Sequence, residues 1–290
     1  MEPVLSSRSD TRVGWNPGDG PQNRSRRSRA FVAMLTHPLR RLGTGVLFAT
    51  FGTGAVIVAF LAFPALAWRS KGVERELAAQ RLIGSSCALF VSLGCWLRLF
   101  ELREIDTQLL GDSPGLVIAT HPTLLDVVFL LSRMPQADCI VKAEAWGNPF
   151  LRHVLKVAGY VPNHDGRSVI AACVERLRAG RSIIVFPEGT RSPADGLRPF
   201  RRGFAHIALQ SGCQVTPVLV SCDPPALKRG QPWWDVPDTK LVFTLDVGAP
   251  FRVEALPGVA AARSRSLAAR AITSEVRRRF ETRGLHVTDA

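Results

Sequence analysis

Apolar residues are concentrated in two long segments near the N-terminus of this 290-residue chain. The first runs from Gly43 to Ala67 without a charged side chain, and its length of about twenty-five residues is enough to cross a hydrocarbon core of roughly 30 Å. The second, from Leu82 to Leu97, is shorter. We therefore expect residues 31–100 to form a membrane-anchoring helical hairpin in which residues 82–100 return. A buried or surface-lying amphipathic helix is the alternative for this second segment.

Basic residues flank the first apolar segment on both sides. Arg40 and Arg41 precede it, and Arg69 and Lys71 follow it. Positive charge is typical of chain segments on the cytoplasmic side of a membrane. The pattern favours a location at the cytoplasmic (inner) membrane, with the larger C-terminal part of the chain facing the cytoplasm.

From Gly115 onward, short apolar runs alternate with amphipathic stretches. The expected strands are 115–120, 138–142, 182–186, 215–220 and 240–247, and the expected helices are 123–133, 147–159, 167–179 and 201–212. This alternation predicts an α/β domain over residues 101–252, with a largely parallel sheet flanked by helices. In such sheets, binding sites form at the carboxyl ends of the strands.

The two ends of the chain have a different composition. Residues 1–30 are rich in Ser, Arg, Gly, Asp and Pro, and we expect a disordered basic N-terminus there. Residues 253–290 are expected to form a basic C-terminal helix or tail. A helix over 263–283 would present a solvated or membrane-facing surface.

An imidazole and a carboxylate lie five residues apart in His121-Pro-Thr-Leu-Leu-Asp126, directly after an apolar run. A residue before proline is disfavoured in a helix, and proline is favoured at the first helical position. We therefore expect His121 in the turn between strand and helix, and Asp126 in the first turn or two of the helix. From there the carboxylate can bond to one ring nitrogen and leave the other to accept a proton. A helix-capping histidine beside a surface aspartate is the alternative interpretation.

A second polar motif, Phe186-Pro-Glu-Gly-Thr-Arg191, also follows an apolar run. Gly189 permits a tight turn, and the guanidinium of Arg191 can bind a phosphate in a bidentate manner. Taken alone, the segment is equally compatible with a surface turn that carries an ordinary salt bridge. Because both motifs follow strands of one predicted sheet, we expect both at its carboxyl edge.

The chain carries a formal net charge of +13 and a pI near 10.6, which indicates an anionic partner surface, either nucleic acid or lipid. The arginines are scattered and no nucleic-acid-binding motif is present, so nucleic acid is disfavoured. The six cysteines form no CxxC pair and have no histidine at ligand spacing. They predict reduced, buried thiols and no metal site.

In order and spacing, His121-xxxx-Asp126, Phe186-Pro-Glu-Gly-Thr-Arg191 and the later Val215-Thr-Pro-Val218 resemble blocks of the glycerolipid acyltransferase family. The resemblance covers residues 100–250. It implies a membrane-bound O-acyltransferase that moves a fatty acyl group from a thioester, acyl-coenzyme A or acyl-carrier protein, to the free hydroxyl of a lysophospholipid. The most direct acceptor is 1-acyl-glycerol-3-phosphate, giving phosphatidate. The resemblance implies no resident cofactor and no metal.

The same resemblance assigns roles to individual residues. His121 would be the general base and Asp126 its orienting partner, and the acceptor oxygen would attack the thioester without an acyl-enzyme. The acceptor site would be lined by Glu188, Gly189, Thr190 and Arg191, with Arg191 on the phosphate. Further phosphate candidates are Lys142, Arg201 and Arg202.

The chain departs from the family pattern at two places. Many members carry Asn before the histidine, where this chain has Thr120. The segment between the main blocks usually ends in a phosphate-contacting basic residue, and here either Asn163 occupies that position or Arg167 serves it from a longer loop. The identity of the acceptor lipid therefore stays open, and a lyso-aminolipid or another specialised lipid is the alternative to 1-acyl-glycerol-3-phosphate. A thioester hydrolase is a further alternative, although the chain has no G-x-S-x-G elbow.

Overall fold

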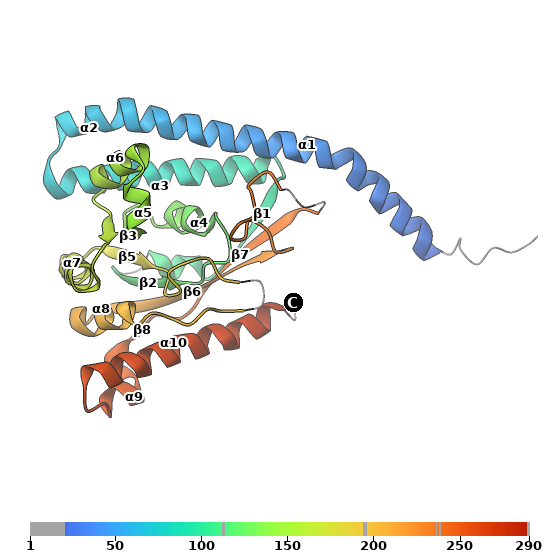
Figure 1. Cartoon of the computed structure of the whole chain (residues 1–290). Helices are drawn as coiled ribbons and strands as arrows, with labels where there is room; N and C mark the ends of the chain where they lie inside the picture. The colour runs from blue at the N-terminus through green and yellow to red at the C-terminus, as the bar shows by residue number, and fades with distance from the viewer. Residues whose placement is uncertain (1–20, 112–113, 194–195, 236, 238, 289–290) are drawn as a thin grey trace, which may run out of the picture.

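An eight-stranded sheet forms the middle layer of the molecule, with helices on both faces (Figure 1). The computed structural model describes residues 21–111, 114–193, 196–235, 237 and 239–288. Seven strands follow the order β1-β7-β6-β2-β5-β3-β4, and β8 pairs with β6. Their bounds are β1 Phe100–Ile105, β2 Gly115–Ala119, β3 Ala137–Lys142, β4 Val161–Asn163, β5 Ser182–Val185, β6 Gln214–Asp223, β7 Leu241–Val247 and β8 Phe251–Arg252.

The sheet is mixed and mostly parallel, as the alternation of strands and helices predicts. Strand β6 runs antiparallel to β7 and β8, and the remaining pairs are parallel. The five expected strands are all present within a few residues of their predicted bounds. The sequence pattern does not indicate β1, β4 or β8, because these strands are short or half exposed and carry no continuous apolar run.

Side chains of each central strand divide between two cores. In β2, Val117 and Ala119 pack into the core on one face, whereas Leu116 and Ile118 pack into the core on the other, as the period of two along a strand requires. The first core includes α3 (Gly72–Trp96), α4 (Asp126–Arg133) and α6 (Pro149–Val157), and the second includes α7 (Gly166–Arg178), α8 (Gly203–Ser211) and α10 (Arg265–Thr288). Short helical segments are Thr107–Leu110, α5 (Ala143–Trp146), Val253–Ala255 and α9 (Pro257–Ala260).

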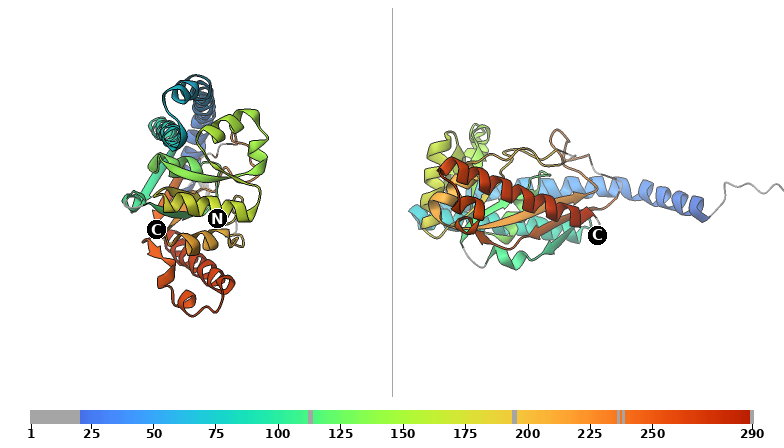
Figure 2. Two further views of the ribbon diagram at one scale, coloured as in Figure 1. Left: turned by 90° about the vertical axis from the view of Figure 1, so that its left-hand side faces the viewer. Right: turned by 90° about the horizontal axis from the view of Figure 1, so that it is seen from below.

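The N-terminal apolar segments form two adjacent helical rods (Figures 1 and 2). The first consists of α1 (Pro21–Ile57), a π-helical turn (Val58–Ala62) and α2 (Phe63–Arg69), and the second is α3. By length and composition, Pro38–Leu66 and Gly72–Trp96 are both able to cross a membrane. The second rod starts at Gly72, earlier than the predicted 82–100 segment.

Helix α3 lies between α1 and the sheet and packs against the α/β domain (Figure 1). A Cβ atom at Gly84 would meet Pro135 at 2.5 Å, and one at Gly94 would meet the Phe100 ring at 2.3 Å. These close approaches fix α3 on the domain. They favour the alternative of a partly buried helix over a free second membrane crossing.

Two predictions about the chain ends differ from the structure. Residues 1–20 lie outside the described residues, but residues 21–30 form the first turns of α1 instead of a disordered segment, because extending an existing helix is easier than nucleating one. The C-terminal helix is no separate tail. Ala269, Ile272, Val276 and Phe280 of α10 are fully or almost fully buried in the second core.

Candidate active site

The carboxyl edge of the parallel strands collects the polar motifs. Because β2, β5, β3 and β4 are parallel neighbours, their C-terminal ends lie along one edge. His121 and Phe186 follow β2 and β5, while Lys142 and Asn163 end β3 and β4. All four residues line one cavity of about 660 Å³.

The histidine and the aspartate of the first motif are in contact. His121 Nδ1 lies 2.8 Å from Asp126 Oδ2. Asp126 is fully buried at the start of α4, which begins three residues later than the helix expected over 123–133. Burial raises the pKa of the Asp126 carboxyl, while the hydrogen bond from His121 acts in the opposite direction. With Nδ1 engaged, Nε2 is the nitrogen that can accept a proton.

Two neighbours hold this pair in place. Thr123 donates to Asp126 twice, from its backbone N–H to Oδ2 at 2.7 Å and from its hydroxyl to Oδ1 at 2.5 Å. The Phe186 ring stacks on the imidazole, with centroids 4.3 Å apart and planes 27° apart. The carboxylate and the imidazole are therefore both fixed before any substrate binds. The interpretation of a helix cap beside a surface aspartate is wrong, because Asp126 is not on the surface.

Glu188 holds a turn and does not line the cavity, contrary to the expected acceptor role. Its buried carboxylate accepts from the Ser192 hydroxyl at 2.5 Å and from the Arg198 backbone N–H at 2.9 Å. The Ser192 N–H in turn donates to the His121 carbonyl oxygen at 2.7 Å. Glu188 therefore ties the second motif to the first.

Gly189 and Thr190 line the cavity as expected. Gly189 has φ of +69°, and a Cβ atom there would meet Arg201 Nε at 2.9 Å. Both features require glycine. The tight turn predicted at this position is confirmed.

Arg191 lines the cavity but already has partners. Its Nη1 donates to the carbonyl oxygens of Leu227 at 3.0 Å and Lys228 at 2.8 Å. The Leu227 oxygen also accepts from the Leu124 N–H at 3.1 Å. One backbone carbonyl of the loop between β6 and β7 thus contacts both motifs.

The cavity around His121 is strongly cationic. Its lining includes Lys142, Arg191, Arg201 and Arg229, and none of the described lining residues is Asp or Glu. Asn163 and Arg167 are the two residues expected to take the place of the family's basic residue between the main motifs, and of these Asn163 lines the cavity. Arg167 is exposed and is not among the described residues that line it.

Sequence reasoning missed three residues of this site. Thr123 and Phe186 lie inside the recognised motifs, and their contacts with Asp126 and His121 depend on the turn that follows each strand. Arg229 lies in a long segment without apolar periodicity, so nothing in its local sequence marks it. Thr120, one residue before His121, bonds to the backbone of Val220 instead of the imidazole.

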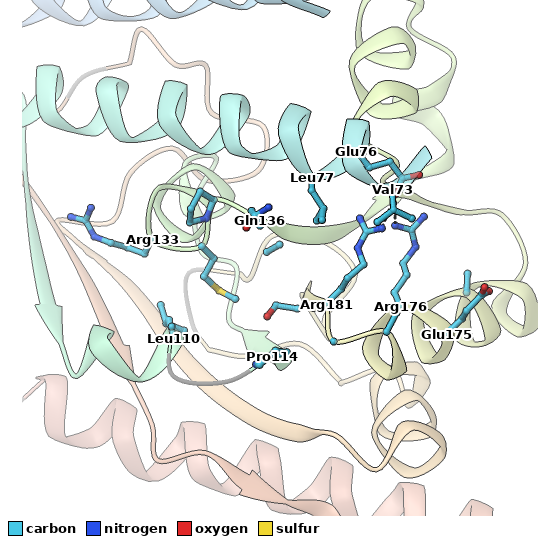
Figure 3. Close-up of a pocket in the computed structure, with 18 residues that line it drawn as sticks. Val73, Glu76, Leu77, Leu110, Pro114, Arg133, Gln136, Glu175, Arg176 and Arg181 are labelled. Atoms are coloured by element: carbon cyan, nitrogen blue, oxygen red, sulfur yellow. Dashed lines mark hydrogen bonds and ion pairs between the residues drawn. The ribbon is translucent and has the colours of Figure 1, made fainter. Parts of the chain in front are cut away.

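A second cavity of about 620 Å³ lies at the opposite, amino edge of the sheet (Figure 3). Three of its charged residues, Glu76, Arg176 and Arg181, form an ion cluster with Asp138 of β3. Arg181 contacts Glu76 of α3 at 2.6 Å and Asp138 of β3 at 2.7 Å, and Arg176 contacts Asp138 at 2.7 Å. This ion cluster fastens α3 to the sheet and is separate from the predicted site residues.

The six cysteines are free thiols, of which Cys87, Cys139 and Cys173 are buried. Burial raises the pKa of the Cys173 and Cys222 thiols to about 12. Within the described residues, no group of three or more His, Cys, Asp or Glu side chains is arranged to hold a metal ion.

Comparison with known proteins relates the segment that carries both motifs to a known family. The sequence model of the family named Acyltransferase matches residues 101–221, which include both motifs. Residues 101–221 belong to the acyltransferase family. The match begins at the strand next to α3 and ends within β6, so it covers the sheet edge that holds the His–Asp pair.

Named proteins similar to this chain include a chloroplastic 1-acyl-sn-glycerol-3-phosphate acyltransferase of Brassica napus. It is 33% identical over 125 residues, which cover 41% of this chain and 36% of that protein. A lyso-ornithine lipid O-acyltransferase of Pseudomonas aeruginosa is 29% identical over 134 residues, covering 43% of this chain and 52% of that protein. The chain therefore spans only a third to a half of these relatives.

The acyltransferase fold extends beyond the matched segment. The crystal structure of the 1-acyl-sn-glycerophosphate acyltransferase of Thermotoga maritima matches with a TM-score of 0.59 and 21% identity, covering 84% of this chain and 97% of that one. The likeness at this identity concerns the fold. It extends over more of the chain than the family match at residues 101–221 does.

Proposed function

We propose that this protein moves a fatty acyl group from an acyl thioester to the free hydroxyl of a lysophospholipid, with 1-acyl-glycerol-3-phosphate as the acceptor. One observation carries the proposal. A buried carboxylate holds Nδ1 of His121, which lines a cavity whose charged lining is entirely cationic among the described residues. A base beside several cations suits a hydroxyl that is close to a phosphate.

The reaction requires one proton carrier. His121 Nε2 would take the proton of the acceptor hydroxyl as its oxygen attacks the thioester carbonyl carbon. The carbon–sulfur bond then breaks, and the imidazolium returns the proton to the leaving thiolate. Asp126 would stabilise the imidazolium and keep its orientation. The donor would be acyl-coenzyme A or acyl-carrier protein.

The charge of the cavity favours a phosphate acceptor over an aminolipid. An ammonium head group would face Lys142, Arg201 and Arg229 without an acidic partner among the described lining residues, and like charges in one cavity repel. The lyso-ornithine lipid acceptor that the Pseudomonas relative's name specifies is therefore the second choice.

We further propose that the two N-terminal rods bind the membrane and that the catalytic domain faces the cytoplasm. Large apolar side chains are exposed along them, among them Leu39, Leu42, Leu61, Trp68, Leu89 and Trp96. Exposed apolar surface of this extent is typical of a membrane or protein contact. Since α3 also packs on the domain, the rods would keep the active-site edge close to the lipid surface.

Acyl transfer by the purified protein in detergent tests the proposal. Radiolabelled acyl-coenzyme A and acyl-carrier protein would be offered with 1-acyl-glycerol-3-phosphate, a lyso-ornithine lipid and no acceptor, with His121→Ala as the matched control. We expect phosphatidate from the wild type and loss of at least 10²-fold in His121→Ala. If only the lyso-ornithine lipid gives product, the proposed acceptor is wrong and the ornithine lipid takes its place. Free fatty acid without an acceptor would indicate hydrolysis, and no His121-dependent turnover at all would refute the proposal.

A further inference from the structure

The loop between β6 and β7 connects the catalytic motifs to the N-terminal rod. Near its start, the Leu227 carbonyl accepts from Leu124 and Arg191. Farther along, the Trp233 ring stacks on Phe48 of α1, with centroids 5.0 Å apart and planes 28° apart. The segment between these two anchors carries Arg229 onto the His121 cavity.

Arg229 is one of three cations of the cavity, with Lys142 and Arg201, whose side chains make no hydrogen bond or ion pair within the described residues. Arg191, in contrast, donates from Nη1 to two carbonyl oxygens. Gly230, the next residue, has φ of +84°, and this left-handed conformation turns the chain directly after the arginine.

The cavity also lacks a charge at one position. Asn163, at the end of β4, faces the cavity where a basic residue was expected, and Arg167 lies outside it. Arg229 reaches the same cavity from a distant part of the sequence. It therefore adds to the cavity a cation that β4 does not provide.

We propose that Arg229 binds the phosphate of the lipid acceptor and is a determinant of acceptor specificity in this chain. The inference rests on the proposed function. A phosphate monoester is present both on 1-acyl-glycerol-3-phosphate and on coenzyme A. In the acceptor the phosphate and the reacting hydroxyl are on adjacent carbons, so a cation that shares a cavity with His121 suits the acceptor. In the donor the whole pantetheine arm separates the thioester from the phosphates.

Kinetics of Arg229→Ala and Arg229→Lys test the assignment, with KM measured separately for 1-acyl-glycerol-3-phosphate and for acyl-coenzyme A. Loss of a charge-assisted hydrogen bond predicts an increase of about tenfold or more in the acceptor KM of Arg229→Ala. Arg229→Lys should recover part of it, and the donor KM should not change. Arg270→Ala, on exposed α10 surface away from the cavity, is the matched control for loss of one charge.

Binding in a His121→Ala background separates this inference from the proposed function. If the wild type transfers no acyl group, the proposed function fails, but the affinity of His121→Ala for 1-acyl-glycerol-3-phosphate still reports on Arg229. A tenfold weaker affinity of His121→Ala/Arg229→Ala than of His121→Ala supports the assignment. Three results would overturn the assignment. The affinity could be unchanged, or Arg229→Ala could raise the donor KM instead of the acceptor KM. The acceptor KM could also rise in Arg167→Ala and not in Arg229→Ala.

Discussion

The hydroxyl of Thr123 lies 2.5 Å from Asp126 Oδ1, on the side of the carboxylate opposite to His121. Thr123 is 1% exposed and Asp126 is 0% exposed, so no water competes for this bond. Both oxygens of the carboxylate are satisfied, one by the hydroxyl and one by the imidazole and a backbone N–H. Thr123 therefore fixes the plane of the group that orients His121.

Replacing Thr123 by Val removes the hydroxyl and keeps the shape of the side chain. The buried Oδ1 would lose its partner, and the carboxylate could rotate away from His121. We expect kcat to fall about tenfold with an unchanged acceptor KM, since a hydrogen bond to a charged group contributes about 1.5–3 kcal/mol. Steady-state kinetics of Thr123→Ser provides the control, because Ser keeps the hydroxyl. Equal losses in Thr123→Val and Thr123→Ser would rule out the positioning role.

Asp126→Asn should separate activity from stability. Burial raises the pKa of this carboxyl above its ordinary value of 3.8, so the folded protein holds the proton more tightly than the unfolded chain does. Below the unfolded pKa both states are protonated. As the pH rises from there through the folded pKa, ionisation of the buried group lowers the stability, and the loss persists at neutral pH. Asn carries no charge and avoids this loss.

We therefore expect Asp126→Asn to raise Tm at pH 7 by about 2–4 °C and to lower kcat by about 10²–10⁴-fold. The difference in Tm should shrink as the pH is lowered toward 4. Thermal denaturation over pH 4–8 measures it. A variant less stable than the wild type at pH 7 would show that the bonds from His121 and Thr123 outweigh the cost of burial.

Glu188→Gln distinguishes a structural glutamate from a substrate-binding one. Its new amide nitrogen would face either the Ser192 hydroxyl or the Arg198 N–H, both of which now donate to the carboxylate. We expect the free energy of unfolding of the substrate-free protein to fall by about 1–3 kcal/mol. Denaturant unfolding measures the effect. If stability is unchanged and only the acceptor KM rises, Glu188 contacts substrate after all.

Arg181→Met should loosen α3 from the domain. Arg181 is 8% exposed and bridges Glu76 and Asp138; Figure 3 shows Arg181 beside Glu76. Loss of the guanidinium leaves the two carboxylates with less positive charge to compensate them. Removal of one partner from a buried ion cluster costs about 3–5 kcal/mol. Denaturant unfolding should show this loss, whereas Arg265→Met, at an exposed position on α10, should leave stability unchanged. A loss below about 1 kcal/mol would mean that apolar packing alone holds α3.

Leu61→Glu tests the membrane surface. Leu61 is 69% exposed on the first rod, and insertion of a leucine side chain into lipid contributes about 1.5–3 kcal/mol. We expect at least a tenfold lower affinity for anionic phospholipid vesicles in sedimentation assays. The control is Leu267→Glu, which alters a leucine of 48% exposure on α10, on the other side of the sheet (Figure 1). Equal effects of both substitutions would argue against the rods as the contact surface.

The strands and the two motifs could be predicted from sequence because their signals are local. A buried parallel strand requires a continuous apolar run such as Ile183–Val185, and the polar residues directly after it must lie at its carboxyl end. His121 and Asp126 could be paired for the same reason, since only one turn separates them. The role of α10 was misjudged because its many arginines conceal the apolar positions Ile272, Val276 and Phe280.

The sequence by itself therefore determined the α/β architecture, the sheet edge that carries both motifs and the contact between His121 and Asp126, since each depends on residues close together in the chain. Tertiary structure decided which charged side chains line the cavity. Glu188 is turned inward by Arg198, Arg167 remains outside the cavity, and Arg229 enters it on a loop fixed by Arg191 and α1. These placements depend on contacts between residues far apart in the sequence, and no local periodicity encodes them.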